Sequence, residues 1–531
     1  MTRQIKTGQM VALGGVFVLL LLSAVTLSSQ AQPIALDPKA MPRIGAVDER
    51  FQSYNIEMVE ITGGRFWKPY KSKGTESQAG NRPTGAGPAG VDPNLFEYRP
   101  PMDLSNARLR KLAAVLGPVY VRVSGTWANT IYFHDSNDPA PEKPPTGFNA
   151  ILTRQQWKGV VDFTRAMNGK LMTSVAIGPG NRDDKGVWTP EQARRFFAYT
   201  KSLGGEIAAV EFMNEPNFAA TGGAPKGYDG AAFGRDIEVF RRFLKEASPN
   251  TLLLGPGTLG EAGVLTRAAA ARLKSEDLLK ATGPVFDIFS YHMYAAVSQR
   301  CAAQMPAIGT TPGAALSKDW LDRPLEIHAF YADLRDRFLP GKAMWLTETA
   351  DTACGGNAWA TTFLDAFRYL NQAASLAQRG VQLRAHNTLS ASDYGLLDET
   401  TYEPRPNYWA AVLWQRLMGT GVLNPGTQSA NDLYTYAHCQ ANRPGGVTVL
   451  AINAGATEQD VQISQQAERY TLSATQPDSA VIQLNGQTLQ AGRDGSLPKM
   501  AGVSVKRGAL KLPPTSITFL VFSQAKNNAC Q

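Results

Sequence analysis

Eight short apolar segments recur between residues 51 and 389, and helix-like segments separate them. The segments 189–204 and 231–247, for example, carry apolar residues at helical spacing, and Thr189-Pro190 supplies an N-cap followed by proline. Strands that alternate with helices are typical of a parallel sheet covered by helices, and eight repeats favour a closed (β/α)₈ TIM barrel over an open doubly wound sheet. The expected strands are 51–61, 118–125, 169–178, 207–213, 250–257, 284–294, 342–348 and 380–389.

The pattern changes after residue 420. Short β-like runs, such as 446–453 and 516–523, are separated by turn-rich stretches, which predicts a β-sandwich. We therefore expect a barrel over 47–420 and a C-terminal β-sandwich over 421–531. A lead-in over 32–46 precedes the barrel and could pair with the sandwich.

The N-terminus has the three parts of a secretory signal peptide over residues 1–31. Arg3 and Lys6 come first, an apolar stretch follows, and small residues stand at the expected cleavage site near Ala31. The apolar stretch is also near the minimum length for a membrane span, so an uncleaved anchor is the alternative. Either interpretation predicts export, to the periplasm or the medium, with membrane contact only in the anchored case.

Composition argues against nucleic acid as a partner. The formal net charge is +8, but Lys and Arg are scattered without a dense basic run. The sequence has no Cys-x-x-Cys pair and only 5 histidines, so we expect no structural metal and no cofactor. Residues 255–260 fit the G-x-G-x-x-G pattern, yet they follow the fifth strand and contain Pro256, which favours a tight barrel loop over a dinucleotide site.

Two glutamates follow strands that lie apart in the expected barrel. The fourth strand runs into Asn214-Glu215, and the seventh ends at Glu348. Because active sites of such barrels lie at the carboxyl ends of the strands, we expect the two carboxylates to face each other across the mouth. Paired carboxylates are what glycoside cleavage requires, and a separation of roughly 5–5.5 Å implies retention of configuration. Asn214 is then placed to bind the 2-hydroxyl of the sugar.

Two other functions remain open at this point. A lone glutamate near a strand end can be a solvated or helix-capping carboxylate, so the chain could be a carbohydrate-binding protein without catalysis. It could also hydrolyse a neutral β-glycoside. The placement of the two glutamates resembles that of clan A retaining glycoside hydrolases, which implies Glu215 as acid/base and Glu348 as nucleophile.

A closer resemblance extends over residues 48 to 531. The segments "PVYVRVSGTWANTIYF", "VEFMNEPN", "MWLTETADTACGGN" and "DYGLLDETTYEPRPNYW" are similar to glycoside hydrolase family 79, the heparanase and β-glucuronidase family. The resemblance implies cleavage of β-linked glucuronic acid residues. Mammalian members lose a linker on activation, whereas here only a Pro-rich loop over 133–147 stands in its place, so a single-chain enzyme is expected, as in bacterial relatives.

The resemblance also implies substrate-binding positions. His292 and Tyr294, at the end of the sixth strand, would line the subsite where the sugar is cleaved, and a tyrosine there can hydrogen-bond the nucleophile. Glu57, in the first strand, would contact sugar hydroxyls.

A third group would recognise the carboxylate of a uronic acid. It consists of Tyr394 and the backbone amides of Gly355 and Gly356, although one extra residue precedes these glycines in comparison with the family. The implied partner is a glucuronic acid-containing polysaccharide or glycan, with heparan sulfate as one candidate. The segment 259–273 lacks the paired arginines that would face sulfate groups, which leaves Arg267 and Arg300 for that role.

Four cysteines in an exported protein predict two disulfides. The resemblance implies that Cys439 pairs with Cys530 inside the β-sandwich. Cys301 and Cys354 follow strands six and seven, which are neighbours in a barrel, and we therefore expect them to pair and brace the rim.

Overall fold

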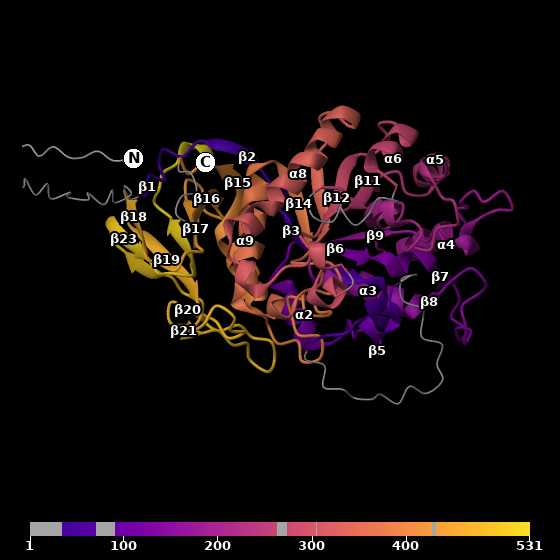
Figure 1. Cartoon of the computed structure of the whole chain (residues 1–531), viewed down its shortest axis with the longest axis horizontal. Helices are drawn as coiled ribbons and strands as arrows, with labels where there is room; N and C mark the ends of the chain where they lie inside the picture. The colour runs from indigo at the N-terminus through magenta and orange to yellow at the C-terminus, as the bar shows by residue number, and fades with distance from the viewer. Residues whose placement is uncertain (1–33, 71–90, 263–272, 304, 427–431) are drawn as a thin grey trace, which may run out of the picture. The chain divides into compact units, whose positions relative to one another are not determined.

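The computed structural model describes residues 34–70, 91–262, 273–303, 305–426 and 432–531 (Figure 1). The predicted signal segment and Arg267 lie outside these ranges. Within them, no helix is both long enough and apolar enough to cross a membrane.

The centre of the fold is a closed barrel of eight parallel strands, and each overlaps a strand expected from the sequence (Figure 1). Pairing of the last strand with the first, Arg384 opposite Gln52, closes the barrel. The strands are β3 (Gln52–Glu57), β6 (Val119–Ser124), β9 (Gly169–Ser174), β10 (Ile207–Glu211), β11 (Leu252–Leu259), β12 (Ile288–Met293), β13 (Met344–Thr349) and β14 (Val381–His386).

A helix follows each barrel strand and covers its outer face. These helices are α2 (Ala107–Ala114), α3 (Arg154–Ala166), α4 (Glu191–Ser202), α5 (Gly230–Ala247), α6 (Ser275–Thr282), α8 (Lys318–Phe338), α9 (Phe363–Gln378) and α10 (Pro406–Leu417). The predicted first strand, 51–61, is too long. It ends at Glu57 because Glu57 and Glu60 form a capping box that starts the short helix α1 (Met58–Thr62).

The barrel interior changes from apolar to charged along the strands. One buried cluster fills it with Tyr120, Met172, Ala209, Leu254, Trp345 and Leu383. Side chains of a strand alternate between two faces, so the next inward position comes two residues later. Those positions are polar on four strands: Arg122 on β6, Ser174 on β9, Glu211 on β10 and Thr347 on β13.

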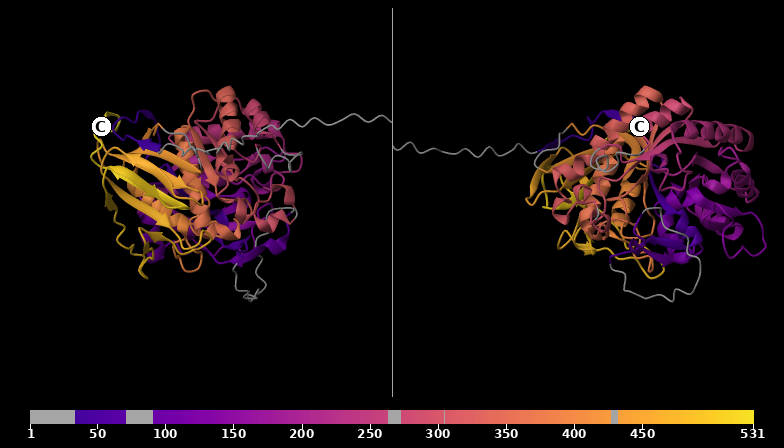
Figure 2. Two further views of the ribbon diagram at one scale, coloured as in Figure 1. Left: turned by 60° about the vertical axis from the view of Figure 1, so that its left-hand side comes forward. Right: turned by 45° about the vertical axis from the view of Figure 1, so that its right-hand side comes forward.

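Beyond the barrel, two sheets form the predicted β-sandwich (Figure 2). The larger sheet has 9 strands, namely β2 (Arg43–Ala46), β15 (Met418–Leu423), β16 (Leu433–Gln440), β17 (Val447–Asn453), β24 (Ser516–Phe522), β19 (Ala467–Ser473), β20 (Gln483–Leu484), β21 (Gln487–Thr488) and β22 (Val503–Val505). The smaller has 3, namely β1 (Ile34–Leu36), β18 (Gln459–Ile463) and β23 (Gly508–Leu512). The lead-in thus contributes one strand to each sheet.

The larger sheet is covered on both faces. Along β24, Phe519 and Val521 join the core of the barrel, while Leu520 and Phe522 join the core between the two sheets. This explains why every residue of β24 is buried. A disulfide between Cys439 and Cys530 ties the C-terminus to β16.

Candidate active site

A β-bulge in β13 aims Glu348 into the barrel. The pairing of β12 with β13 shifts register just before His292, so His292 lies opposite Glu348 and Thr347 is the extra residue. Thr347 also reaches the interior, where its Oγ1 donates to Glu211 Oε1 at 2.7 Å. Regular alternation would have turned one of these two neighbours outward.

Glu215 enters the mouth from the turn that follows β10. Asn129 fixes this turn: its Nδ2 donates to the carbonyl oxygen of Asn214 at 3.0 Å, and its Oδ1 accepts from the Asn214 N–H at 2.9 Å. Glu215 itself has φ of 49°, a left-handed conformation that residues other than glycine adopt at a cost.

Arg122 lies below the two glutamates and connects three elements. Its Nη1 donates to Glu348 Oε2 at 2.8 Å, and its Nη2 donates to Asn214 Oδ1 at 2.9 Å. Its Nη2 and Nε also bind Glu211 Oε2, at 2.8 and 3.2 Å. Both Arg122 and Glu211 are 1% exposed, so a buried charge network supports Glu348.

Neither Arg122 nor Glu211 was predicted as a site residue. The signal was present, because each is a charge inside a strand expected to be buried on both faces. Burial opposes the charge of Glu211, but Arg122 outweighs it and holds the pKa of that carboxyl well below its usual range. Glu211 is therefore a permanent anion that keeps Arg122 in place.

His292 lies between the two carboxylates. Its Nδ1 is 3.1 Å from Glu215 Oε1 and 3.7 Å from Glu348 Oε2. Burial by itself lowers the pKa of His292, but the charge of Glu348 and the neighbouring carboxylates outweigh burial and raise it to about 9. The carboxylates around His292 therefore favour a proton on its ring.

One carboxylate oxygen of Glu215, one of Glu348 and a ring nitrogen of His292 lie within 4.8 Å of one another. Such a trio could hold a metal ion by distance alone. Arg122 is already bonded to Glu348 at 2.8 Å, however, and its positive charge would repel a cation. The trio fits a carboxylate pair used for acid and nucleophile chemistry better than a metal centre.

The structure brings the predicted tyrosines and Glu57 to the same mouth. Tyr294 donates its hydroxyl to Glu348 Oε1 at 2.9 Å. Asn387, which sequence reasoning missed, directs its Nδ2 to the Tyr294 hydroxyl at 3.0 Å, the Tyr394 hydroxyl at 3.3 Å and Glu57 Oε1 at 3.1 Å. Asn387 follows β14 in a segment that we treated only as a strand end.

Glu57 has a buried carboxyl group, and one of its two oxygens is not used in a hydrogen bond to any described residue. Within the described part of the chain, its Oε2 has no hydrogen-bond partner. Burial and the nearby charge of Glu348 raise the pKa of Glu57 well above its usual range. Gly125, with φ of 89°, makes room for it, since a Cβ there would lie 1.6 Å from Glu57 Oε2.

The two predicted glycines lie beside Tyr394, where a Cβ on Gly356 would come within 2.9 Å of Tyr394 Cβ. The Cys301–Cys354 disulfide is present immediately before them. Arg300 does not extend to solvent as a sulfate-binding cation would. Its side chain is 7% exposed, and its guanidinium group pairs with Asp393.

No family model matches the sequence. Heparanase-like protein 1 of Arabidopsis thaliana is 24% identical over 493 residues, which cover 81% of this chain and 86% of the relative. Heparanase of Bos taurus is 26% identical over 500 residues, which cover 83% of this chain and 87% of the relative. The chain is a homologue of the heparanases.

Two further comparisons give matches to proteins named as glucuronidases. Baicalin-beta-D-glucuronidase of Scutellaria baicalensis is 32% identical to this heparanase homologue over 187 residues, or 33% of this chain and 35% of the relative. The crystal structure of a 4-O-alpha-L-rhamnosyl-beta-D-glucuronidase from Fusarium oxysporum superimposes with a TM-score of 0.62 at 12% identity, over 92% of this chain and 100% of that one. The structural likeness shows a shared fold.

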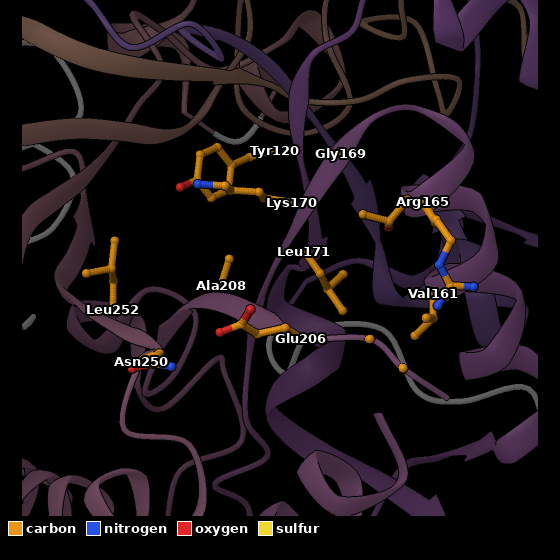
Figure 3. Close-up of a pocket in the computed structure, with 13 residues that line it drawn as sticks. Tyr120, Val161, Arg165, Gly169, Lys170, Leu171, Glu206, Ala208, Asn250 and Leu252 are labelled. Carbon is orange, nitrogen blue, oxygen red and sulfur yellow. The ribbon is translucent and has the colours of Figure 1, made fainter. Parts of the chain in front are cut away.

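A separate cavity of about 450 Å³ lies at the other end of the barrel of this heparanase homologue (Figure 3). Its lining comes from helix α3, from the first residues of β9, and from residues at or just before the start of β10 and β11, such as Glu206 and Asn250. Lys170 lies beside the ring of Tyr120, 5.8 Å from its centroid. This end of a barrel serves stability rather than catalysis, and the cavity holds no facing pair of carboxylates among its described residues.

Titration of Glu215 tests the electrostatics of the site. Burial raises the pKa of Glu215, and the charge of Glu348 raises it further against the lowering effect of the His292 hydrogen bond. A raised pKa means that Glu215 keeps its proton above the ordinary glutamate value of about 4.3. Glu348→Gln removes one cause, so ¹³C NMR titration should show a lower pKa for Glu215 in that variant. An equal or higher value would contradict the coupling.

Proposed function

We propose that this chain is a retaining hydrolase of β-linked glucuronic acid residues, with Glu215 as acid/base and Glu348 as nucleophile. The heparanase and glucuronidase homologues support a glycoside hydrolase that acts on glucuronides. The observation that carries the assignment is the approach of Glu215 and Glu348 oxygens to within 4.8 Å across the barrel mouth. At this spacing a carboxylate can reach the anomeric carbon directly, without room for an intervening water.

The environments of the two acids differ as the two roles require. Glu348 accepts hydrogen bonds from Arg122 and Tyr294, two donors that hold its carboxylate in place as the nucleophile. Glu215 has its pKa raised by burial and by the charge of Glu348, which keeps it protonated as an acid. In the first step Glu348 attacks the anomeric carbon as Glu215 gives its proton to the departing glycosidic oxygen.

The second step reverses these roles. Once Glu348 is esterified to the sugar its charge is gone, and one cause of the raised pKa of Glu215 goes with it. Glu215 is then the stronger acid, so its carboxylate remains to take a proton from the incoming water. That water attacks the anomeric carbon, releases Glu348 and gives a product of retained configuration.

Recognition of the uronic acid is assigned to the group beside Glu348. Gly355 and Gly356 are buried, and each has a positive φ, of 80° and 82°. Neither of their amide N–H groups donates to a protein acceptor among the described residues. Buried free N–H groups suit an anion, and the hydroxyl of Tyr394 would add a donor. Asn214, His292 and Glu57 are assigned to the sugar hydroxyls.

The natural substrate would be a glucuronic acid-containing glycan, with heparan sulfate as one candidate polymer. We also infer that the protein acts in the periplasm or the medium, since the N-terminal segment has the parts of a signal peptide or anchor.

Hydrolysis of aryl β-glucuronide and aryl β-glucoside, followed by ¹H NMR of the first-formed sugar, tests this function. We expect glucuronide to be cleaved with a higher kcat/KM and the β-anomer of glucuronic acid to appear first. Appearance of the α-anomer would exclude the double displacement. Preferential cleavage of the glucoside would favour a neutral β-glycoside, and cleavage of neither would favour a binding protein.

A further inference from the structure

The Arg300 side chain makes hydrogen bonds to other protein groups at the rim of the barrel. It belongs to the short helix α7 (Gln299–Ala302), which follows β12. Its Nη1 donates to the carbonyl oxygens of Cys354 and Gly356, at 2.5 and 3.0 Å, and its Nη2 donates to Asp393 Oδ2 at 2.5 Å. One planar fork therefore connects the loops that follow three consecutive strands, β12, β13 and β14.

Each of the three carbonyl groups of the glycine loop accepts a hydrogen bond from a neighbouring loop. Cys354 O accepts from Arg300 and from Ser298 Oγ, the latter at 2.9 Å. Gly355 O accepts from Ser392 Oγ at 2.9 Å and from the N–H of Asp393 at 3.1 Å. Gly356 O accepts from Arg300.

A held carbonyl fixes the direction of the next amide. The peptide unit is planar and trans, so the C=O of Cys354 and the N–H of Gly355 point in opposite directions from one plane. Arg300 thereby sets where the Gly355 N–H points, and the residues at 392–393 set the direction of the Gly356 N–H in the same way. Each of the two N–H groups therefore points away from the donors that hold the carbonyl group before it.

The guanidinium group of Arg300 is itself held in place by Tyr70 and Asp393. Its guanidinium carbon lies 4.1 Å from the centroid of the Tyr70 ring. The Tyr70 hydroxyl accepts from the N–H of Arg300 at 3.0 Å, and Asp393 Oδ2 accepts from the N–H of Tyr70 at 3.3 Å. Asp393 is 5% exposed in its side chain and balances the buried charge. A side chain fixed by several partners is suited to setting geometry.

We propose that Arg300 is a positioning residue for recognition of the uronic acid carboxylate. It orients the peptide plane that presents the Gly355 N–H, and it acts through that plane without touching the sugar. This rests on the proposed function, because it requires the carboxylate on C5 of the sugar to lie at Gly355 and Gly356. A neutral sugar carries CH₂OH on C5, and its binding depends much less on the orientation of these N–H groups.

The test compares kcat/KM for aryl β-glucuronide with that for aryl β-glucoside in Arg300→Met and Arg300→Lys. In Arg300→Met the Gly355 N–H should lose its orientation and with it the hydrogen bond to the charged carboxylate of the substrate. We therefore expect this variant to lower kcat/KM for the glucuronide about 10- to 100-fold. The glucoside value should change less than about 3-fold, so that the preference collapses. Lysine keeps the charge but cannot hold two carbonyls and Asp393 in one plane, so it should behave as methionine does.

Arg323→Met is the matched control. Arg323 also binds a rim carbonyl, that of Ala295 at 3.2 Å, and an aspartate, Asp319 at 2.8 Å, but it does not contact the glycine loop. It should leave the substrate preference unchanged. If Arg300→Met does not fold, as judged by circular dichroism, Ser298→Ala removes the other donor to Cys354 O with little loss of volume and should reduce the same preference about 3- to 10-fold.

Three results would overturn the proposal. Equal losses on both substrates in Arg300→Met would show a merely structural role. A normal preference in Arg300→Lys would show that charge alone suffices. If the arginine variants fail to fold, an unchanged substrate preference in Ser298→Ala would show that the donors to Cys354 O do not set the orientation of the peptide plane. If the wild type cleaves no glucuronide, the proposed function fails instead.

Discussion

Replacement of Glu348 by glycine is expected to lower turnover of aryl β-glucuronide by at least about 10⁴-fold, with activity restored by sodium azide. The truncated side chain leaves a space on the face of the sugar that the nucleophile occupied. Azide entering there attacks the anomeric carbon once and gives the α-glucuronyl azide, which ¹H NMR identifies. In the variant Arg122 still pairs with Glu211, so its buried positive charge keeps a negatively charged partner.

Glu348→Gln serves as the companion variant. It retains the size of the side chain and the room for its neighbours, so it should be equally inactive but should gain nothing from azide. Circular dichroism and thermal unfolding of both variants check that the barrel is intact. Retention of more than about a tenth of the activity by Glu348→Gly, or an azide product of β configuration, would place the nucleophile elsewhere.

Removal of the proton donor, by Glu215→Gln, is expected to have an effect that depends on the leaving group. General acid catalysis contributes about 10²–10⁴-fold, and a poor leaving group needs all of it. A polysaccharide or a methylumbelliferyl glucuronide should therefore lose about 10³-fold or more in kcat/KM. Dinitrophenolate departs without a proton, so with that substrate the glucuronyl-enzyme should form readily and accumulate, visible as a burst and by mass spectrometry.

Glu206→Gln is the control for this experiment, since Glu206 is exposed and lies just before β10, the strand that Glu215 follows. It should leave all these rates unchanged. A uniform loss on every substrate in Glu215→Gln, without a burst, would mean that Glu215 is not the proton donor.

Much of this arrangement could be predicted from the sequence because it depends on local patterns. Short apolar runs separated by amphipathic helices specify a barrel, and a carboxylate at the end of such a run lies at the mouth. The end of the first strand was misplaced because the capping box of Glu57 and Glu60 interrupts an apolar run that continues to Ile61. Capping competes with strand extension at that position, and pattern alone does not show which prevails.

Other parts depend on pairings between distant residues. The inward direction of Glu348 results from a bulge in the register of β12 and β13, and no local pattern encodes that register. Arg122 and Glu211 are each unexpected alone in a buried strand, and only their contact explains them. Arg300 was a candidate for binding sulfate because its burial and its partner Asp393 could not be seen in the sequence.

The sheet that contains β24 has a consequence for how the chain can be divided. The composition changes near residue 420, but residues on either side of that point share one apolar core, in which Phe519 packs with the helices of the barrel. At the boundary, the N–H of Val47 donates to the carbonyl of Thr420, and the lead-in adds β2 to the edge of β15. A fragment that stopped at residue 420 would expose that core to water and lose the partner of β2. The boundary near residue 420 thus separates two sequence patterns within a single compact unit, and a catalytic fragment would have to include both the lead-in and the β-sandwich.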